Sequence, residues 1–433
     1  MGSVHFALTA AFAAALCLTA AAGRADRPGR QRGARQAVAI PWEMAALSKP
    51  PQTYPAPGPQ AEGVQALFYE GPPLEGKRTT VFAFYGKPKG ASAKRKVPGI
   101  VLVHGGGGTA FDWWVRLWNK RGYAAIAMDH GGGAPQGFKN EFPGPGLNEA
   151  FSKVDSPPED QWPYHAVAQV VLANSLLRSF PEVDANRIGI TGLSWGGYLT
   201  CMAAGVDKRF RFAVPVYGCG FLHEDSAWLP TFEQIGPEQT KRWVSLWDPS
   251  RYLPLAQMPI LWVTGTNDFA YPLDSLEKSY HLPKGPRALA IRVEMSHAHG
   301  GAGENPPEIL GFAESIVSGG RPLPRILRQG RNAHYAWARF TTKAPIVKAE
   351  FNYTTDSGAW KERKWHIATP TLDQSKTGGR VTAKLPAGTT VFHFNLWQEV
   401  ARRDLWALDG SKVIPAKDRL MCISTEHVEL GKS

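Results

Sequence analysis

The sequence Arg187-Ile-Gly-Ile-Thr-Gly-Leu-Ser-Trp-Gly-Gly-Tyr198 decides the fold that we expect for this chain. Its isoleucines alternate with small residues, as in a short buried strand, and helix-forming residues resume at Tyr198. Between strand and helix lies Gly192-Leu-Ser-Trp-Gly196, a G-x-S-x-G pattern. The glycines allow strand and helix to close around a strained serine whose hydroxyl projects from the sheet edge. The pattern predicts a nucleophilic Ser194; a glycine-rich turn with an ordinary serine is the alternative.

Composition limits the class of protein. At 433 residues the chain is long enough for two domains plus extensions. Lysine and arginine exceed aspartate and glutamate by 49 to 37, a net charge of +12. Apart from residues 24–35 and 94–96 these cations are scattered, and no nucleic-acid-binding motif accompanies them. We therefore expect a solvated basic surface and no nucleic-acid partner.

The N-terminus is typical of an export signal. Residues 6–22 form an uninterrupted apolar run that ends in Ala20-Ala-Ala22, a small-x-small cleavage pattern. The run is short for a membrane-spanning helix. We expect residues 1–22 to be a signal peptide, with the mature protein secreted or periplasmic and no integral membrane span left after cleavage. A membrane anchor is the alternative.

Two further features of the sequence, residues 23–63 and the cysteines, each leave two structural interpretations open. The segment is rich in proline and glycine, which predicts a linker or a strap over the surface. Cys201, Cys219 and Cys422 follow the predicted signal peptide. Their positions are compatible either with a Cys201–Cys219 bridge or with buried free thiols.

Strands alternate with helices between residues 64 and 320. The apolar run at 98–103 is typical of a buried parallel strand, and residues 111–121 are typical of an amphipathic helix. This alternation predicts an α/β domain with a mostly parallel sheet and helices on both faces. The other expected strands are 65–69, 79–85, 123–128, 212–217, 259–264 and 287–295, and the other expected helices are 162–178, 272–280 and 307–317.

A glycine-rich loop, His104-Gly-Gly-Gly-Gly108, follows the strand at 98–103. Its N–H groups at Gly106 and Gly107, with that of Trp195 after the serine, are placed to hold a developing oxyanion. A flexible loop or a phosphate cradle is the alternative, but no Lys-Ser/Thr pair follows the glycines.

The partners expected for the serine follow the last two strands of this region. Asp268 comes directly after the strand at 259–264, with Asp274 in the next helix as its competitor. Ser296-His-Ala-His-Gly300 follows the final strand and supplies His297 as general base, with His299 as the alternative base. Two histidines this close can also begin a metal site, but no further ligands stand at suitable spacing, so we expect no metal.

Two long insertions are too large for ordinary connections. Residues 131–158 are expected to form a pocket wall or lid. Residues 218–253 are expected to form a helical cap over the sheet edge, and their aromatic side chains either line a pocket or pack within the cap. The cap tryptophans are Trp228, Trp243 and Trp247. Asp129 and His130 end a strand, where they either touch substrate or stabilise the loop.

After residue 320 the pattern changes. Short alternating β-rich stretches separated by turns predict that residues 321–433 form a small β-sandwich of immunoglobulin-like or fibronectin-like type. Its tryptophans either form a sugar-stacking platform or serve packing. They are Trp337, Trp360, Trp365 and Trp397.

From residue 65 to residue 317 the chain resembles the α/β-hydrolase superfamily, and within it the prolyl oligopeptidase, dienelactone hydrolase and acetylxylan esterase-like group. The residues that carry the resemblance are His104-Gly-Gly-Gly, Gly192-Leu-Ser-Trp-Gly-Gly197, Gly265-Thr-Asn-Asp268 and Ser296-His-Ala-His299. The resemblance implies a triad of Ser194, Asp268 and His297, in the chain order of that superfamily. It also implies oxyanion donors at Gly106 and Trp195.

The expected activity is two-step acyl transfer from a carboxylic ester to water, without metal or organic cofactor. The expected substrates are small-molecule or polysaccharide esters, above all short-chain esters of carbohydrates such as acetylated xylan. One alternative is a serine peptidase that acts on small peptides. The other is a binding protein on a catalytically silent scaffold.

Overall fold

The computed structural model describes residues 40–59, 61–400 and 420–431, which belong to one compact unit. The predicted signal peptide, residues 1–22, and part of the predicted linker, residues 23–63, lie outside the described residues. Among the described residues, no helix has both the length and the hydropathy needed to cross a bilayer.

A mixed sheet forms the centre of the first part of the fold. In the described chain it has nine strands in the order β1-β2-β3-β5-β4-β6-β7-β8-β9. Strands β4 to β9 run parallel to one another. Strands β1, β2 and β3 form an antiparallel edge, in which β3 pairs antiparallel with β5. The strands are β1 (Thr53–Pro55), β2 (Val64–Glu70), β3 (Thr80–Gly86), β4 (Val97–Val103), β5 (Ala124–Met128), β6 (Val183–Leu193), β7 (Ala213–Val216), β8 (Ile260–Gly265) and β9 (Arg287–Arg292).

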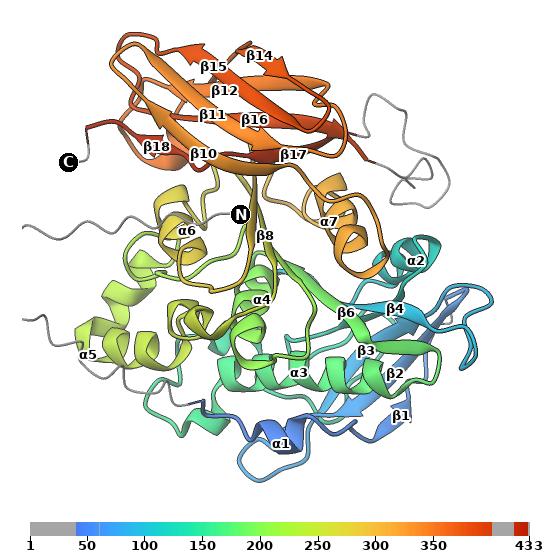
Figure 1. The fold of residues 1–433 in the computed structure, drawn as a ribbon. Coiled ribbons are helices and arrows are strands. Elements are labelled where there is room, and N and C mark those ends of the chain that lie inside the picture. The colour runs from blue at the N-terminus through green and yellow to red at the C-terminus, as the bar shows by residue number, and fades with distance from the viewer. Residues whose placement is uncertain (1–39, 60, 401–419, 432–433) are drawn as a thin grey trace, which may run out of the picture. The chain divides into compact units, whose positions relative to one another are not determined.

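Helices cover both faces of this sheet (Figure 1). One face packs against α2 (Asp112–Lys120) and α7 (Pro307–Val317), the other against α3 (Trp162–Ser179) and α4 (Trp195–Val206). A mostly parallel sheet with helices on both faces is the predicted α/β-hydrolase architecture. Its central strands are buried because alternate residues face the two helix layers. The remaining helices are α1 (Met44–Leu47), α5 (Leu229–Trp247), α6 (Leu273–Tyr280), η1 (Leu147–Glu149), η2 (Pro158–Asp160), η3 (Pro249–Arg251), η4 (Leu253–Leu255) and η5 (Trp360–Glu362).

The chain after residue 320 forms two antiparallel sheets that enclose a separate apolar core. One sheet has the order β10-β11-β15-β14, and the other joins β13, β12, β16 and β17, with β18 also paired to β16. The strands are β10 (Arg325–Arg331), β11 (Tyr335–Thr341), β12 (Lys348–Thr354), β13 (His366–Ala368), β14 (Thr371–Gln374), β15 (Gly378–Lys384), β16 (Val391–Glu399), β17 (Leu420–Ser424) and β18 (Val428–Glu429).

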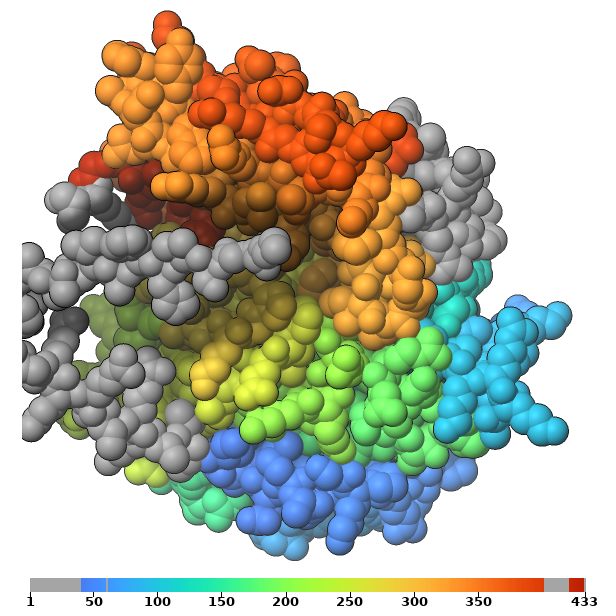
Figure 2. Space-filling model, viewed as in Figure 1, coloured from blue at the N-terminus to red at the C-terminus, as the bar shows by residue number. Residues whose placement is uncertain are grey.

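Buried polar contacts join the edge strand β9 to the antiparallel sheets, which lie against the α/β part in Figure 2. The N–H of Ile291 donates to Ser424 Oγ at 2.7 Å, and its carbonyl accepts from Asn395 Nδ2 at 3.0 Å. The fully buried Glu308 accepts the N–H of Cys422 at 2.6 Å and pairs with Arg292. The open edge of the large sheet is thereby covered.

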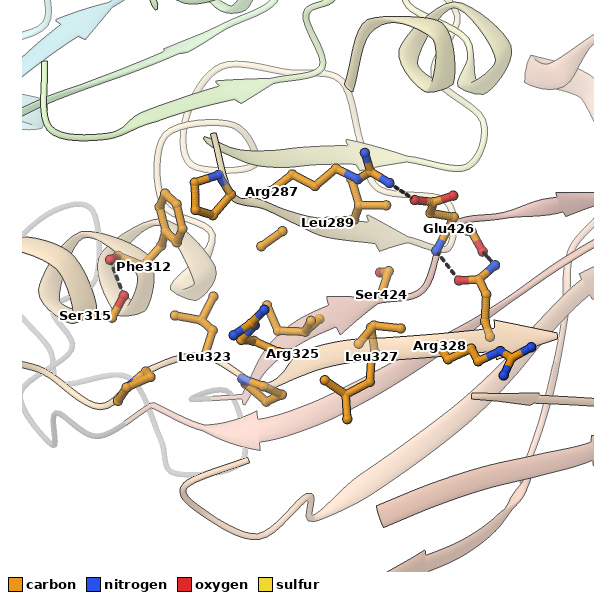
Figure 3. A pocket seen from close by; sticks show the side chains of 17 residues that line it. Arg287, Leu289, Phe312, Ser315, Leu323, Arg325, Leu327, Arg328, Ser424 and Glu426 are labelled. Carbon is orange, nitrogen blue, oxygen red and sulfur yellow. Dashed lines mark hydrogen bonds and ion pairs between the residues drawn. The ribbon is translucent and has the colours of Figure 1, made fainter. Parts of the chain in front are cut away.

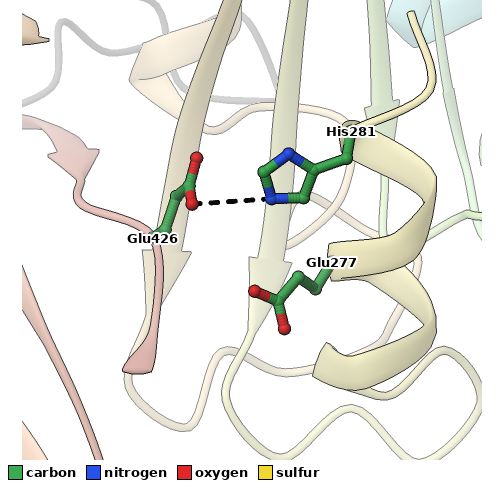
Figure 4. Close-up of side chains that lie close together, drawn as sticks. All are labelled: Glu277, His281 and Glu426. Atoms are coloured by element: carbon green, nitrogen blue, oxygen red, sulfur yellow. Dashed lines mark ion pairs between the residues drawn. The ribbon is translucent and has the colours of Figure 1, made fainter. Parts of the chain in front are cut away.

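A groove of about 530 Å³ lies between β9, α7 and β10 (Figure 3). Its walls include Leu289, Phe312 and Leu323, and the Arg287–Glu426 ion pair lies among its lining residues. Side chains of metal-ligand type lie close to this ion pair: Glu277 of α6 and His281, which directly follows α6, approach Glu426 (Figure 4). Arg287 hydrogen-bonds His281 Nδ1 at 3.1 Å and pairs with Glu426, so a cation of the chain itself balances these groups.

Part of the stretch expected to be a linker is ordered as a strap. Strand β1 adds to the edge of the large sheet beside β2. Trp42 is buried, donates its indole N–H to Tyr164 O at 2.9 Å, and packs on Tyr252. The strap alternative is the one that these contacts support.

The three cysteines among the described residues are buried free thiols. Cys201 Sγ lies 3.6 Å from Gly218 O, and burial raises the pKa of both Cys201 and Cys219 well above the ordinary value. Of the two alternatives, the structure has the free thiols.

Candidate active site

Ser194 stands at the turn between β6 and α4 with φ 55° and ψ −120°. A non-glycine residue in this region is strained, by on the order of 1–3 kcal/mol. The strain is held by the neighbours, since the Ser194 N–H donates to Val216 O on β7 at 3.0 Å. The turn therefore has the strained geometry that the G-x-S-x-G pattern predicts.

The glycines on either side of Ser194 have no room for a side chain. A Cβ added at Gly196 would lie 2.0 Å from Val103 O, and one at Gly192 would lie 2.4 Å from Gly196 O. Strand β4, strand β6 and helix α4 meet here backbone to backbone. The serine is held by three elements at once.

The glycine-rich loop His104–Gly108 lies beside this turn. A Cβ added at Gly106 would lie 3.0 Å from Trp195 Cδ1, so two of the three predicted oxyanion donors are adjacent. Within the described residues, the N–H groups of Gly106 and Gly107 have no hydrogen-bond acceptor. Trp195 opens α4, where helix N–H groups have no acceptor inside the helix. These three donors are available to a bound oxygen.

Asp268 and His297 form a hydrogen-bonded pair. His297 Nδ1 lies 2.8 Å from Asp268 Oδ2. The other oxygen of the buried carboxylate accepts the N–H groups of Ala270 and Tyr271 at 2.9 and 2.7 Å. Tyr217 stacks on the imidazole at 4.2 Å between centroids. The ring is thus oriented by a carboxylate that is itself fixed by the backbone.

His299 has its own carboxylate. Its Nδ1 lies 3.0 Å from Oε1 of Glu304, whose side chain is fully buried. Glu304 also accepts the N–H groups of Gly300 and Gly301. The histidine loop therefore presents two imidazoles, each oriented through Nδ1 by a different acid. Among the described residues, the clusters of metal-ligand-type side chains include neither His297 nor His299.

His299 lies beside the glycine-rich loop, next to Ser194. A Cβ added at Gly105 would lie 3.0 Å from Ser194 Cβ and 3.3 Å from His299 Nε2, so His299 borders the same glycine as the serine. Within the described residues, Ser194 Oγ is hydrogen-bonded to neither imidazole. Such bonds are often long without substrate and tighten when it binds.

Several other candidates prove to be supports. Asp129 accepts from Gly131 N, Gly133 N and Thr109 Oγ1, as expected for a loop-stabilising residue. His130 stacks on His104 at 3.9 Å, and burial lowers its pKa to about 3. Asp274 lies in the first turn of α6 and accepts the N–H of Ser275. The acids bonded to His297 and His299 are Asp268 and Glu304 instead.

Of the three cap tryptophans, two are packed in the interior and one lies beside the Ser194 turn. Trp243 and Trp247 are fully buried and donate their indole N–H groups to Ala150 O and Gln161 Oε1. Trp228 is only half-buried and packs against Trp195 at 4.7 Å. Only Trp228 of the three is therefore placed to meet a ligand over the turn.

The insertion at residues 131–158 borders the glycine-rich loop through one side chain. Leu147 Cδ2 lies 3.4 Å from the Cβ position of Gly106, and Phe151 packs on Trp195 at 5.8 Å. These contacts place the insertion beside the candidate oxyanion donors.

Two residues of this arrangement were not foreseen from the sequence. Glu304 is the first carboxylate after His299, in a loop otherwise made of glycine and alanine, and this isolation is the signal that could have identified it. Tyr217 ends a strand like many other aromatic residues, and only the fold places it on His297.

A comparison with known families covers the part of the chain that carries the candidate site. Residues 109–308 match the prolyl oligopeptidase family, a range that contains the serine, both histidines and both acids. This match supports hydrolase chemistry. Over residues 109–308 the chain is similar to the prolyl oligopeptidase family, and the described fold is that of the α/β-hydrolases.

Individual relatives include both esterases and peptidases by their names. The acetyl xylan esterase from Paenibacillus sp. R4 has a similar structure, with a TM-score of 0.53 and 23% identity over 63% of this chain and 92% of that one. The uncharacterized peptidase YuxL of Bacillus subtilis is 27% identical over 206 residues, 45% of this chain and 29% of its own length. Hydrolase ORFZ of Pyricularia oryzae is 27% identical over 185 residues, 40% of this chain and 38% of its own. The alignments thus span about a third of these two curated relatives.

Proposed function

We propose that this protein is an exported serine esterase that cleaves short-chain carboxylic esters, with Ser194 as nucleophile. The observation that carries the proposal is the strained Ser194 turn beside the N–H groups of Gly106 and Gly107, which have no acceptor among the described residues. The buried Asp268 orients His297 on the loop that follows the last strand of the same sheet. Serine hydrolases of this superfamily act through such a combination.

The proposed mechanism has two steps. His297 removes the proton of Ser194 as the oxygen attacks the ester carbonyl, and Asp268 stabilises the imidazolium through Nδ1. The oxyanion is held by the N–H groups of Gly106, Gly107 and Trp195; losing one such donor typically costs about 10²–10³-fold in rate. The alcohol leaves with a proton from His297, and water activated by the same base then releases the acid.

For the substrate we propose acetyl esters of carbohydrates. The support is the acetyl xylan esterase of similar fold, together with the predicted export signal. Leu147 and Trp228 beside the turn favour a small acyl group, because they narrow the space around Gly106 and Trp195.

The test is hydrolysis of p-nitrophenyl acetate, butyrate and octanoate by the mature protein and by Ser194→Ala. We expect turnover to fall steeply with acyl length and to vanish in the variant. Equal rates for the two proteins would overturn the proposal.

A peptidase is the second candidate, and the match to the prolyl oligopeptidase family favours it. Aminoacyl p-nitroanilides separate the two candidates, since a peptidase would cleave them faster than the acetyl ester. A protein that cleaves neither and does not react with a serine-directed phosphonate would be a binding protein on this scaffold.

A further inference from the structure

Three arginines form a row across the outer face of the sheet β10-β11-β15-β14. Arg328 pairs in register with Arg339, and Arg339 with Arg380. All three are exposed, while the residues next to them on β11 and β15, among them Ala338 and Val381, point into the core. Adjacent strands lie about 4.8 Å apart, so three positive charges lie side by side. Like charges directly opposite one another destabilise a sheet.

A β-bulge creates the row. The register between β10 and β11 shifts between Ile326 and Arg328, so that Leu327 has no partner on β11. In a regular ladder without the bulge, Leu327 would stand opposite Arg339, and Arg328 would stand opposite Ala338 and face the core, because successive side chains alternate between the two faces. In Figure 3 the Arg328 side chain extends away from Leu323 and Leu327.

An indole ring lies beside the row. Trp337 stands opposite Gly330, and a Cβ there would lie 2.7 Å from the ring, so the ring lies directly over the glycine. The guanidinium of Arg380 is 5.1 Å from the ring centroid. Trp337 and the three arginines together line a depression of about 270 Å³. We call these four residues the arginine–tryptophan face.

The arginines of this face, Arg328, Arg339 and Arg380, form no ion pair within the described part of the chain. Asp373 is the cross-strand neighbour of Arg380, yet it too forms no ion pair with it. An added anion would remove the repulsion between the three guanidinium groups.

We propose that the arginine–tryptophan face binds an acidic polysaccharide, one whose sugars carry carboxylate groups. Guanidinium groups hold carboxylates in paired, charge-assisted hydrogen bonds. The indole offers an apolar surface for a sugar ring beside them. One aromatic ring and three cations on neighbouring strands are enough to contact a few sugar units. This binding function goes beyond the proposed ester hydrolysis and does not require it.

The test compares binding of polygalacturonate, highly methyl-esterified pectin and single-stranded DNA by affinity electrophoresis at physiological salt. The proteins are the unchanged chain, Arg339→Gln, Trp337→Leu, and Arg95→Gln as a control with the same charge change on an exposed loop. We expect polygalacturonate to retard the unchanged protein and Arg95→Gln equally. Arg339→Gln should bind at least about tenfold more weakly, because a charge-assisted bond is lost.

A stability measurement separates binding from folding. Without polysaccharide, Arg339→Gln should unfold at the same temperature or a higher one, since repulsion in the row is relieved. Its rate on p-nitrophenyl acetate should be unchanged, and Ser194→Ala should still bind polygalacturonate. Equal binding by Arg339→Gln and Arg95→Gln, or equal retardation by the methyl-esterified polymer, would overturn the proposal. Stronger binding of DNA than of polygalacturonate would overturn it in favour of a nucleic-acid surface.

Discussion

Two histidines lie within one short loop, and each is oriented through Nδ1 by a buried acid: His297 by Asp268 and His299 by Glu304. Because Nδ1 faces the acid in both pairs, Nε2 is the ring nitrogen that can exchange a proton with the serine or a substrate. The hydrogen bond to Asp268, which follows β8, favours His297 as the base. The position of His299 beside Gly105 and Gly108 of the glycine-rich loop favours a role beside the oxyanion.

The first prediction separates the two histidines. His297→Ala should lower kcat on p-nitrophenyl acetate by about 10³–10⁶-fold, as the loss of a triad member does. His299→Ala should lower it much less, by about 10–10²-fold, if His299 only supports the bound oxyanion.

The acids provide the matched control for this prediction. Asp268→Asn should reproduce most of the His297 loss, because the amide favours the wrong tautomer. Glu304→Gln should resemble His299→Ala. If the His299 and Glu304 variants show the larger losses, His299 is the base.

At the scale of elements, the strand–turn–helix unit β6–α4 depends on backbone contact with β4. The second prediction is that Gly196→Ala destabilises the protein by about 1–3 kcal/mol or more and also lowers kcat, because its methyl group collides with Val103 O. Urea unfolding and p-nitrophenyl acetate hydrolysis measure the two effects.

A second glycine in the same part of the molecule serves as control. A Cβ at Gly133 would have no heavy atom within 4 Å, so Gly133→Ala should leave both stability and rate nearly unchanged. Equal behaviour of the two variants would show that the close approach at Gly196 does not exist in solution.

At the scale of the whole molecule, buried histidines make stability depend on pH. Burial lowers the pKa of His165 to about 4, that of His393 to about 4 and that of His130 to about 3. In the unfolded chain each has a pKa of about 6.5. Between these values the unfolded chain binds more protons than the folded one, so stability falls as the pH falls below about 6.5.

The third prediction is a loss of about 1.4 kcal/mol for each of these histidines per pH unit in that window. Urea unfolding at pH 7.5 and pH 5.5 measures it. Both ring nitrogens of His165 have no hydrogen-bond partner in the described residues, so His165→Leu should leave stability at pH 7.5 almost unchanged and weaken the pH dependence. An unaltered pH dependence in this variant would contradict the assignment.

The fourth prediction concerns the antiparallel sheets. A chain that ends at residue 320 should be insoluble or should lack a cooperative thermal transition. It would expose the edge of β9 and leave the buried Glu308 without its bond from Cys422 N. Sedimentation and circular dichroism of fragments 40–320 and 40–433 give the comparison, and a monodisperse, cooperatively melting short fragment would refute this dependence.

Much of the fold could be predicted from the sequence by itself. Apolar runs such as the one at 98–103 and the G-x-S-x-G turn carry local information, because a buried parallel strand needs a continuous apolar run and a strand-to-helix turn needs glycine. The order of Ser194, Asp268 and His297, each after its strand, followed from the same local patterns. The Asp268–His297 hydrogen bond agrees with that expectation.

Only the tertiary structure decided which side chains meet across long separations. Glu304 beside His299, Tyr217 on His297 and the arginine row depend on loop closure, on strand register and on one bulged residue. A one-residue shift of register moves a side chain to the opposite face of a sheet. Polar residues at exposed positions do not determine the register, because their pattern is compatible with more than one pairing. Local sequence therefore determined the elements and the chain order of the candidate triad, whereas packing and register determined the second histidine–acid pair and the charged face.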